Sequence, residues 1–207
     1  MPKAQESSVR LKSYRQIGAH DWRRSGYDTF SYDSPFFRQW VASQLAPGRA
    51  EILSIGCGSG ELEHHLTELR HAVVGLDLSH QMLKRAARNG LDLLVQADAR
   101  LLPFGSAQFD LVMIIESIGY LMLDEVFQQA RRVLRKRGRL LIATYAARVD
   151  THPRYRKWRM DEMTNRLADA GFRIDERRYL DVRRNSVRDA PSEDRATLLY
   201  ISSTVSN

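Results

Sequence analysis

The sequence has few of the features that mark secreted or membrane-spanning chains. Its 207 residues include one cysteine, Cys57, which excludes an internal disulfide and a zinc site built from several cysteines. No run of about 18 apolar residues occurs, so no transmembrane helix is expected. The first 16 residues are polar and lack the apolar centre of a secretory signal. These absences favour a cytoplasmic protein without a membrane span.

Acidic residues are also in the minority. The chain has 25 Asp and Glu residues against 32 Lys and Arg residues, for a formal net charge of +7. Much of the excess lies in "RRVLRKRGR" (131–139) and "RYRKWR" (154–159). Such clusters are typical of nucleic-acid-binding surfaces and also of ordinary solvated surfaces. Neither cluster lies in a recognised nucleic-acid-binding module, so we interpret both mainly as solvated surface.

Apolar strands and amphipathic helices alternate along most of the chain. Strands are predicted over 50–55, 71–77, 91–98, 109–116 and 139–145, and helices over 61–69, 79–90 and 123–138. A further helix (158–171) and two strands (172–182 and 195–205) follow. This alternation predicts a three-layer, Rossmann-like α/β fold. Its seven-stranded sheet is expected to be mostly parallel, with an antiparallel hairpin at one edge. Residues 1–45, including a helix over 34–45, are expected to form a helical lid on the domain at 46–207.

The glycine-rich segment "ILSIGCGSGELEHHL" (52–66) indicates a ligand site at the end of the first strand of the sheet. Its glycines allow a tight turn and close approach to a ligand, and its amides offer hydrogen-bond donors. Asp77, 21 residues after Gly56, ends the next strand, where a carboxylate can accept hydrogen bonds from ribose hydroxyls. Asp98 ends the following strand, where it can face an adenine amino group. Three successive strand ends therefore predict a nucleoside-binding site.

Residues 50–145 resemble the class I S-adenosylmethionine-dependent methyltransferases, and most closely the small-molecule branch that includes the ubiquinone and menaquinone biosynthesis methyltransferases. The motifs that carry this resemblance are "ILSIGCGSGEL", "VVGLDLSHQML", "VQADARLLPFGSAQFDLVMIIESIGYL" and "QQARRVLRKRGRLLIATY", with "WRRSGYD" near the N-terminus. The resemblance implies the methyltransferase fold, S-adenosylmethionine as the cofactor and S-adenosylhomocysteine as the product. A dinucleotide is less compatible, because the loop lacks Gly-x-Gly-x-x-Gly spacing.

The resemblance also assigns cofactor-binding roles along the chain. It implies that Asp77 binds the ribose and that Cys57 is a small loop residue rather than a nucleophile. The full set comprises the loop residues Gly56, Cys57, Gly58, Ser59 and Gly60 on the methionine and ribose side; Leu78 and Met82 flanking the adenine; Asp98 and Ala99 at the adenine edge; and Glu116, Ser117 and Tyr120 beside the methionine and the methyl group.

Ser54 departs from the family pattern. The family usually has an acid at this position, which helps to hold the methionine ammonium of the cofactor, whereas serine brings no charge. A hydrogen bond to a charged group contributes ~1.5–3 kcal/mol, so we expect another carboxylate to substitute. Glu116 is the first choice, and Asp28 and Asp33 of the lid are alternatives.

The acceptor side is less well defined by the sequence. His152, Tyr32 and Tyr145 are weak candidates for a catalytic base, because positioning alone can suffice with an activated methyl donor. No metal site is expected: Glu61 and His65 share a helix face, but two ligands do not make a site.

The expected function is methyl transfer to a small-molecule metabolite by a monomer or a homodimer. One alternative is an RNA methyltransferase that uses the arginine-rich surface. Against it, the fourth strand ends in "IIESIGY" rather than in an Asn/Asp-Pro-Pro-aromatic run. A second alternative, suggested by Ser54, is a non-catalytic cofactor-binding subunit.

Overall fold

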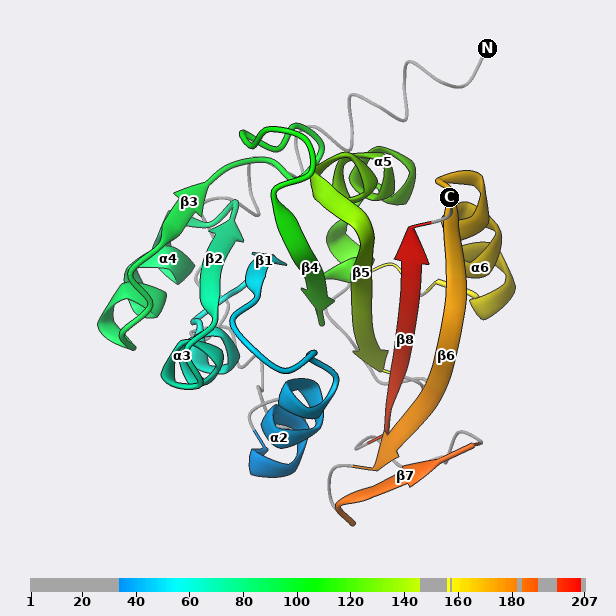
Figure 1. Cartoon of the computed structure of the whole chain (residues 1–207), viewed down its shortest axis with the longest axis horizontal. Helices are drawn as coiled ribbons and strands as arrows, with labels where there is room; N and C mark the ends of the chain where they lie inside the picture. The colour runs from blue at the N-terminus through cyan, green and yellow to red at the C-terminus, as the bar shows by residue number, and fades with distance from the viewer. Residues whose placement is uncertain (1–33, 146–155, 157, 182–183, 190–196, 206–207) are drawn as a thin grey trace.

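One eight-stranded sheet organises the computed structural model, which describes residues 34–145, 156, 158–181, 184–189 and 197–205 (Figure 1). The strand order is β3-β2-β1-β4-β5-β8-β6-β7. The parallel strands are β1 (Glu51–Ile55), β2 (Ala72–Asp77), β3 (Leu94–Gln96), β4 (Phe109–Ile115) and β5 (Leu134–Tyr145). The antiparallel strands are β6 (Phe172–Asp181), β7 (Ser186–Arg188) and β8 (Thr197–Val205).

Helices cover both faces of this sheet and bury two apolar clusters against it. On one face lie α2 (Pro35–Ser43), α3 (Glu61–Glu68) and α4 (His80–Arg88), with the buried side chains of Phe37, Leu66 and Ala86 in one cluster. On the other face, α5 (Leu123–Val133) and α6 (Met160–Asp169) contribute Phe127 and Leu167 to the second cluster. This three-layer arrangement confirms the predicted α/β fold.

The caps predicted for two helices are present. The Oγ of Ser34 accepts a hydrogen bond from the Phe37 amide at the start of α2, and the Oγ of Ser79 accepts one from the Met82 amide at the start of α4. A side-chain cap satisfies an amide that has no partner within the helix, so both helices begin at a defined residue.

The edge of the sheet differs in detail from the prediction. Antiparallel strands follow the parallel ones, as expected, but the sheet has eight strands rather than seven. The extra strand, β7, lies in the segment expected to be a polar turn and pairs with the end of β6. The two predicted final strands, β6 and β8, pair antiparallel as expected, and β8 lies between β5 and β6.

The helix predicted over 123–138 is too long. It ends at Val133, and β5 begins at Leu134, whose buried side chain pairs in register with Phe109 of β4. Burial of Leu134 in the sheet outweighs the helical propensity of the basic residues that follow. Arg137 then adopts a left-handed backbone conformation (φ 63°), which a helix does not allow.

The predicted lid is represented only by α2, because residues 1–33 lie outside the described residues. The division at residue 45 therefore stays a prediction. None of the helices in the described ranges is long and apolar enough to cross a membrane.

Asp110 joins three strands at the edge of the sheet where β4 begins. Its Oδ2 accepts a hydrogen bond from the Glu51 amide of β1 (2.9 Å), and its Oδ1 accepts one from Arg135 Nη1 of β5 (2.7 Å). Burial raises the pKa of this carboxyl, but the bonds from Glu51 and Arg135 outweigh it and hold the pKa below the usual range.

We therefore expect Asp110→Asn to destabilise the fold at neutral pH and much less in acid. Because the folded-state pKa lies below the unfolded value of about 3.9, the carboxylate stabilises the fold above roughly pH 5, and this contribution is lost as the pH falls through the folded pKa. Urea unfolding at pH 7 and at successively lower pH measures the difference from the wild type. A difference that stays constant across this range, or an equal effect of Asp92→Asn at an exposed position, would contradict the assignment.

Candidate active site

The glycine loop lies at the point where the chain reverses direction across the sheet. From β1 the chain proceeds outward to β2 and β3, then returns to β4 on the other side of β1. In such sheets, ligands bind in the crevice at the carboxyl ends of the strands beside this point. Residues 56–60 follow β1, and residues 116–120 follow β4. The two segments touch, because Ser117 Oγ donates a hydrogen bond to the Ile55 carbonyl oxygen (2.9 Å).

Four loop amides are already bonded within the chain. Those of Gly56 and Cys57 donate to the Leu76 carbonyl oxygen (2.7 and 3.1 Å), and that of Gly60 donates to the Cys57 carbonyl oxygen (3.1 Å). The Gly58 amide donates to Asp77 Oδ2 (2.9 Å). The expectation that these amides serve as donors to a ligand is therefore wrong for these four residues. A pyrophosphate would need such donors, so the loop is poorly suited to a dinucleotide.

Two of the glycines allow close packing between chain segments. A Cβ on Gly56 would lie 2.5 Å from Ser117 Cβ, and a Cβ on Gly60 would lie 2.9 Å from Ala86 Cβ of α4. Both residues also have positive φ values, 73° and 78°. A larger side chain would therefore separate the loop from β4 or α4 and strain the backbone.

Asp77 is held at the loop by backbone amides. Its Oδ1 accepts a hydrogen bond from the Ser79 amide (2.7 Å), while its Oδ2 accepts the bond from Gly58. Burial raises the pKa of this carboxyl, and the bonds from Ser79, Gly58 and Leu78 oppose the rise. A carboxylate has about four acceptor positions. Three of these positions are used by the Ser79, Gly58 and Leu78 amides, so Asp77 can accept about one further hydrogen bond, from a ligand hydroxyl, without losing its contacts to the loop.

Acidic groups surround the centre of the loop. The pKa of the Cys57 thiol is raised well above its usual value, first by burial and then by the negative charges of Asp77, Glu63 and, more weakly, Glu61. Cys57 is therefore a protonated packing residue whose sulfur lies under the loop, near Gly75 of β2. The negative potential that acts on this thiol favours a cationic ligand.

Ser54, the residue that departs from the family pattern, donates a short hydrogen bond from its Oγ to Glu63 Oε1 (2.6 Å). Ser54 is 1% exposed and Glu63 is 3% exposed, so a carboxylate from α3 is buried at the end of β1. The sequence reasoning missed Glu63. The signal that could have found it is helical spacing, because Glu63 lies three residues before Leu66 and shares its buried face.

The β4 side of the site is formed by a turn of 3-10 helix, η2 (Ile118–Tyr120). Glu116 precedes it, buried and in a left-handed conformation (φ 55°). The pKa of Tyr120 is raised by burial and then by the negative charge of Glu116. Trp158 supports the turn by donating from its Nε1 to the Ile118 carbonyl oxygen (3.1 Å).

The residues that the resemblance assigns to the adenine lie in packed surroundings, and their role stays a prediction. Ala99 and Met82 are buried, and Met82 Cε lies 3.5 Å from the position of a Cβ on Gly58. Asp98, however, forms an ion pair with Arg100, whose Nε and Nη2 donate to its Oδ2 (2.9 and 2.5 Å). Burial raises the Asp98 pKa, but the bonds and charge of Arg100 hold it below the usual range. Its role at the adenine stays a prediction.

Two further residues brace the site and were not found from the sequence. Asn89 Nδ2 donates to the Ser59 carbonyl oxygen (2.8 Å), and Gln96 Nε2 donates to the Leu78 carbonyl oxygen (3.2 Å). Both are side-chain contacts to backbone oxygens far away in the sequence, for which no local motif exists.

The acceptor candidates are mostly outside the described residues, which do not include Tyr32, His152, Asp28 or Asp33. Tyr145 ends β5, but its side chain is not among those described. Across the described ranges, no group of three or more His, Cys, Asp and Glu residues could hold a metal ion.

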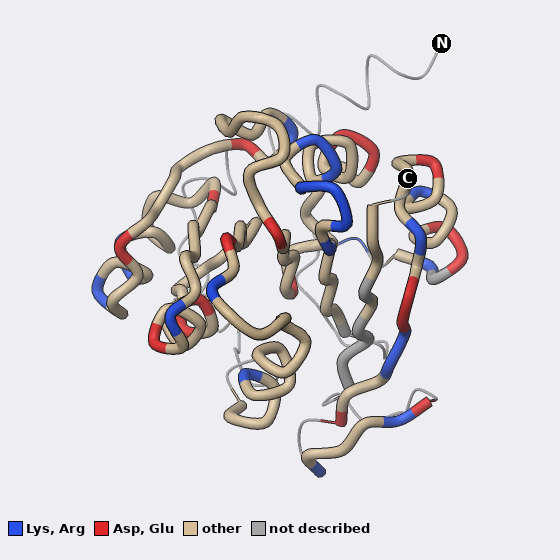
Figure 2. Tube along the Cα trace, viewed as in Figure 1, with Lys and Arg blue, Asp and Glu red and all other residues tan. Residues whose placement is uncertain are grey.

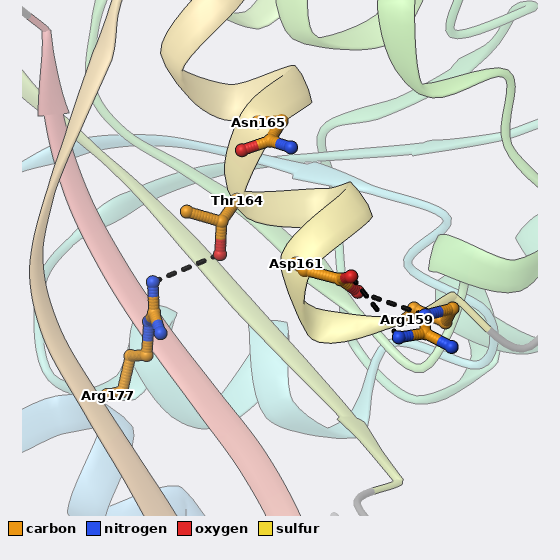
Figure 3. A pocket seen from close by; sticks show the side chains of 5 residues that line it. All are labelled: Arg159, Asp161, Thr164, Asn165 and Arg177. Atoms are coloured by element: carbon orange, nitrogen blue, oxygen red, sulfur yellow. Dashed lines mark hydrogen bonds and ion pairs between the residues drawn. The ribbon is translucent and has the colours of Figure 1, made fainter.

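A surface hollow of about 620 Å³ lies between α6 and β6, away from the glycine loop (Figure 3). Arg177 Nη2 donates there to Thr164 Oγ1 (3.0 Å), and Arg159 pairs with Asp161 (3.1 Å). These polar groups bind one another, and the loop, with its buried acids, is the better candidate for a cofactor site.

Comparison with known proteins agrees with this site. Residues 53–142, which span the glycine loop, β2, β3, β4 and most of β5, match the family model described as "Methyltransferase domain". A malonyl-[acyl-carrier protein] O-methyltransferase from Enterobacter lignolyticus is 39% identical over 53% of this chain and 44% of its own length. A phosphatidylethanolamine N-methyltransferase from Cereibacter sphaeroides is 32% identical over 66% of this chain and 68% of its own length. The crystal structure of an S-adenosylmethionine-dependent methyltransferase from Aquifex aeolicus superposes with a TM-score of 0.66 at 15% identity, over 94% of this chain and 97% of that one.

The fold, the acid-lined loop and these matches show that the chain belongs to the class I S-adenosylmethionine-dependent methyltransferases. S-adenosylmethionine is the cofactor of this family. The chain spans about half the length of the first curated relatives that it matches, 44% and 54% for two of them.

We expect Gly56→Ala to destabilise the protein by roughly 2–4 kcal/mol, because a Cβ would meet Ser117 and the left-handed backbone would be strained. Adding Ser117→Gly removes the obstructing atoms, so the double variant should be more stable than the sum of the two single effects. Adding Ser117→Ala keeps the Cβ and should give no such relief. Urea unfolding of all variants measures the coupling, and simple additivity in both pairs would show that the contact is not limiting.

Proposed function

We propose that this protein is an S-adenosylmethionine-dependent methyltransferase that acts on a small-molecule metabolite. The observation that carries the proposal is the Asp77 carboxylate, fixed at the glycine loop by the Gly58 and Ser79 amides with acceptor capacity left for a ribose hydroxyl. Family membership supports it, since this carboxylate ends β2 in the position that the resemblance assigns to the ribose.

The residues present fit the cofactor electrostatically. S-adenosylmethionine carries positive charge on its sulfonium and its ammonium, and the loop is flanked by the carboxylates of Asp77, Glu63 and Glu61. Opposite charges in a buried site attract more strongly than in water. A ligand with a pyrophosphate would instead be repelled by these acids and would find four of the loop amides occupied.

S-adenosylmethionine would supply a methyl group bonded to a positively charged sulfur: an acceptor nucleophile would attack the methyl carbon in line, the carbon–sulfur bond would break, and S-adenosylhomocysteine would leave. The chain contributes binding and orientation: Asp77 accepts from the ribose, and Met82 gives an apolar surface beside the loop. Glu116 and Tyr120 close the β4 side, where buried side chains exclude water. Correct positioning of two reactants can contribute much of the rate enhancement without a general base.

The positions of the arginines speak against the RNA alternative. In the 131–139 cluster, Arg132 Nη1 donates to the Phe104 carbonyl oxygen (2.6 Å), Arg135 pairs with Asp110, and Arg139 Nη1 donates to the Gln44 carbonyl oxygen (2.7 Å). This segment lies where α5 passes into β5, at the opposite end of the strand from the site (Figure 2). These arginines therefore stabilise the fold at the end of the sheet opposite the glycine loop.

The relatives are named for different acceptors. One is named for a malonyl-[acyl-carrier protein], another for phosphatidylethanolamine and a third for ubiquinone biosynthesis. The relative named for ubiquinone biosynthesis supports a small-molecule acceptor. A cytoplasmic location and a monomeric or homodimeric state complete the proposal.

Calorimetry with S-adenosylmethionine tests the cofactor. We expect wild-type binding and at least a roughly tenfold loss of affinity in Asp77→Ala, because a bond from the ribose to a charged acceptor is removed. Thermal unfolding of the variant shows whether the loop survives the loss of the Gly58 bond. If the wild type does not bind S-adenosylmethionine, both the methyltransferase hypothesis and the hypothesis of a non-catalytic cofactor-binding subunit are refuted.

A labelled-methyl screen tests the reaction. Purified protein with methyl-labelled S-adenosylmethionine should label a component of the small-metabolite fraction of a cell extract, and Asp77→Ala should not. Labelling of the RNA fraction would favour the RNA alternative, which also predicts binding that weakens steeply with salt. Cofactor binding without labelling in any fraction would favour the non-catalytic subunit.

A further inference from the structure

The buried pair of Ser54 and Glu63 places a carboxylate where the sequence has no acid. Ser54 lies at the end of β1, in register with Gly75 of β2 and Met113 of β4, and so occupies the centre of the sheet. Its hydroxyl donates to Glu63 Oε1 (2.6 Å), and both side chains are at least 97% buried. The hydrogen bond therefore fixes the carboxylate of an α3 residue directly behind the glycine loop.

Burying a carboxylate at this position is costly unless it serves a purpose. A charge removed from water needs hydrogen bonds and an opposite charge, and an apolar residue of similar size usually packs at lower cost. Leu62 and Leu66, the neighbours of Glu63 on the same helix face, show that α3 can cover the sheet with apolar side chains alone. A glutamate on this face is therefore not required to cover the sheet.

The charge of Glu63 reaches the loop itself. It is the second carboxylate, after Asp77, that raises the pKa of the buried Cys57 thiol. Asp77 is committed to the Gly58 and Ser79 amides at the end of β2, on the ribose side of the loop. Glu63 belongs to α3 and contacts the end of β1 through Ser54.

We propose that Glu63, held by Ser54, supplies the negative charge that binds the methionine ammonium of S-adenosylmethionine. The acid is thereby relocated from the strand to the helix, nine residues along the chain. This inference rests on the proposed function, because it assumes that the loop binds this cofactor. It also replaces Glu116, our first choice from the sequence, in this role.

Glu116 occupies a different part of the site. It follows β4, and its charge acts on the Tyr120 phenol in the turn that Trp158 supports. Ser117, the next residue, donates from its Oγ to the Ile55 carbonyl oxygen at the end of β1. Glu116 therefore belongs to the segment that follows β4, where the acceptor side is expected.

The test compares two ligands that differ in the ammonium. S-adenosylhomocysteine carries the amino-acid group, whereas 5′-methylthioadenosine lacks it and keeps the adenosine. Glu63→Gln retains an acceptor for Ser54 but removes the charge. We expect its affinity for S-adenosylhomocysteine, measured by calorimetry, to fall roughly 10- to 100-fold, with methylthioadenosine affinity unchanged. Glu68→Gln, at an exposed position on the same helix, should leave both affinities unchanged.

A second variant distinguishes the loss of the Glu63 charge from a general loss of folding. In the double variant Ser54→Asp with Glu63→Ser, the carboxylate and the hydroxyl exchange places. We expect it to bind S-adenosylhomocysteine within about threefold of the wild type, since a similar pair occupies the same space. Failure of this exchange to restore binding, in a variant whose thermal unfolding is normal, would overturn the proposal.

The outcomes separate this inference from the proposed function. If the wild type binds neither ligand, the proposed function fails and the role of Glu63 fails with it. If the wild type binds S-adenosylhomocysteine and Glu63→Gln binds it equally well, only the role of Glu63 is refuted. If only Glu116→Gln lowers the affinity for S-adenosylhomocysteine, Glu116 and not Glu63 binds the methionine ammonium.

Discussion

The attachment of the glycine loop to the end of β2 is the constraint on which the site depends. The Leu76 carbonyl oxygen accepts two loop amides, and the Asp77 carboxylate accepts a third. The loop is thus fixed by its own chain before any ligand arrives, and little conformational entropy remains to be lost on binding. Asp77 has a double role, since the same carboxylate that fixes the loop keeps capacity for a ligand.

The other elements meet this fixed loop at close range. Gly56 lets Ser117 pack against the loop from β4, and Gly60 lets α4 approach through Ala86. The ends of β1, β2 and β4 are therefore joined into one rigid surface. Four loop amides already donate hydrogen bonds within the chain. The surrounding carboxylates, rather than these backbone donors, are therefore expected to select the ligand. The loop has glycines like those of a phosphate cradle but the electrostatics of a cation site.

Local patterns were sufficient to predict the order of elements, the mostly parallel sheet and the position of the loop. Hydrophobic periodicity and caps such as Ser79 are encoded over a few residues, so they can be recognised directly. The end of α5 could not be predicted this way, because Leu134 is drawn into the sheet by a partner, Phe109, that is 25 residues away. The ion pair of Asp98 with Arg100 and the bond from Asn89 to the loop likewise depend on the folded geometry.

The pair of Ser54 and Glu63 shows why one motif position is a poor guide to the loss of a site. At the level of the sequence, Ser54 is a missing acid and suggests a degenerate member of the family. In the fold, a carboxylate lies 2.6 Å from its hydroxyl, so the end of β1 retains a negative charge. A ligand responds to charge and distance, not to the element from which the side chain comes. What the fold must preserve here is therefore a buried carboxylate behind the glycine loop, and either β1 or α3 can provide it.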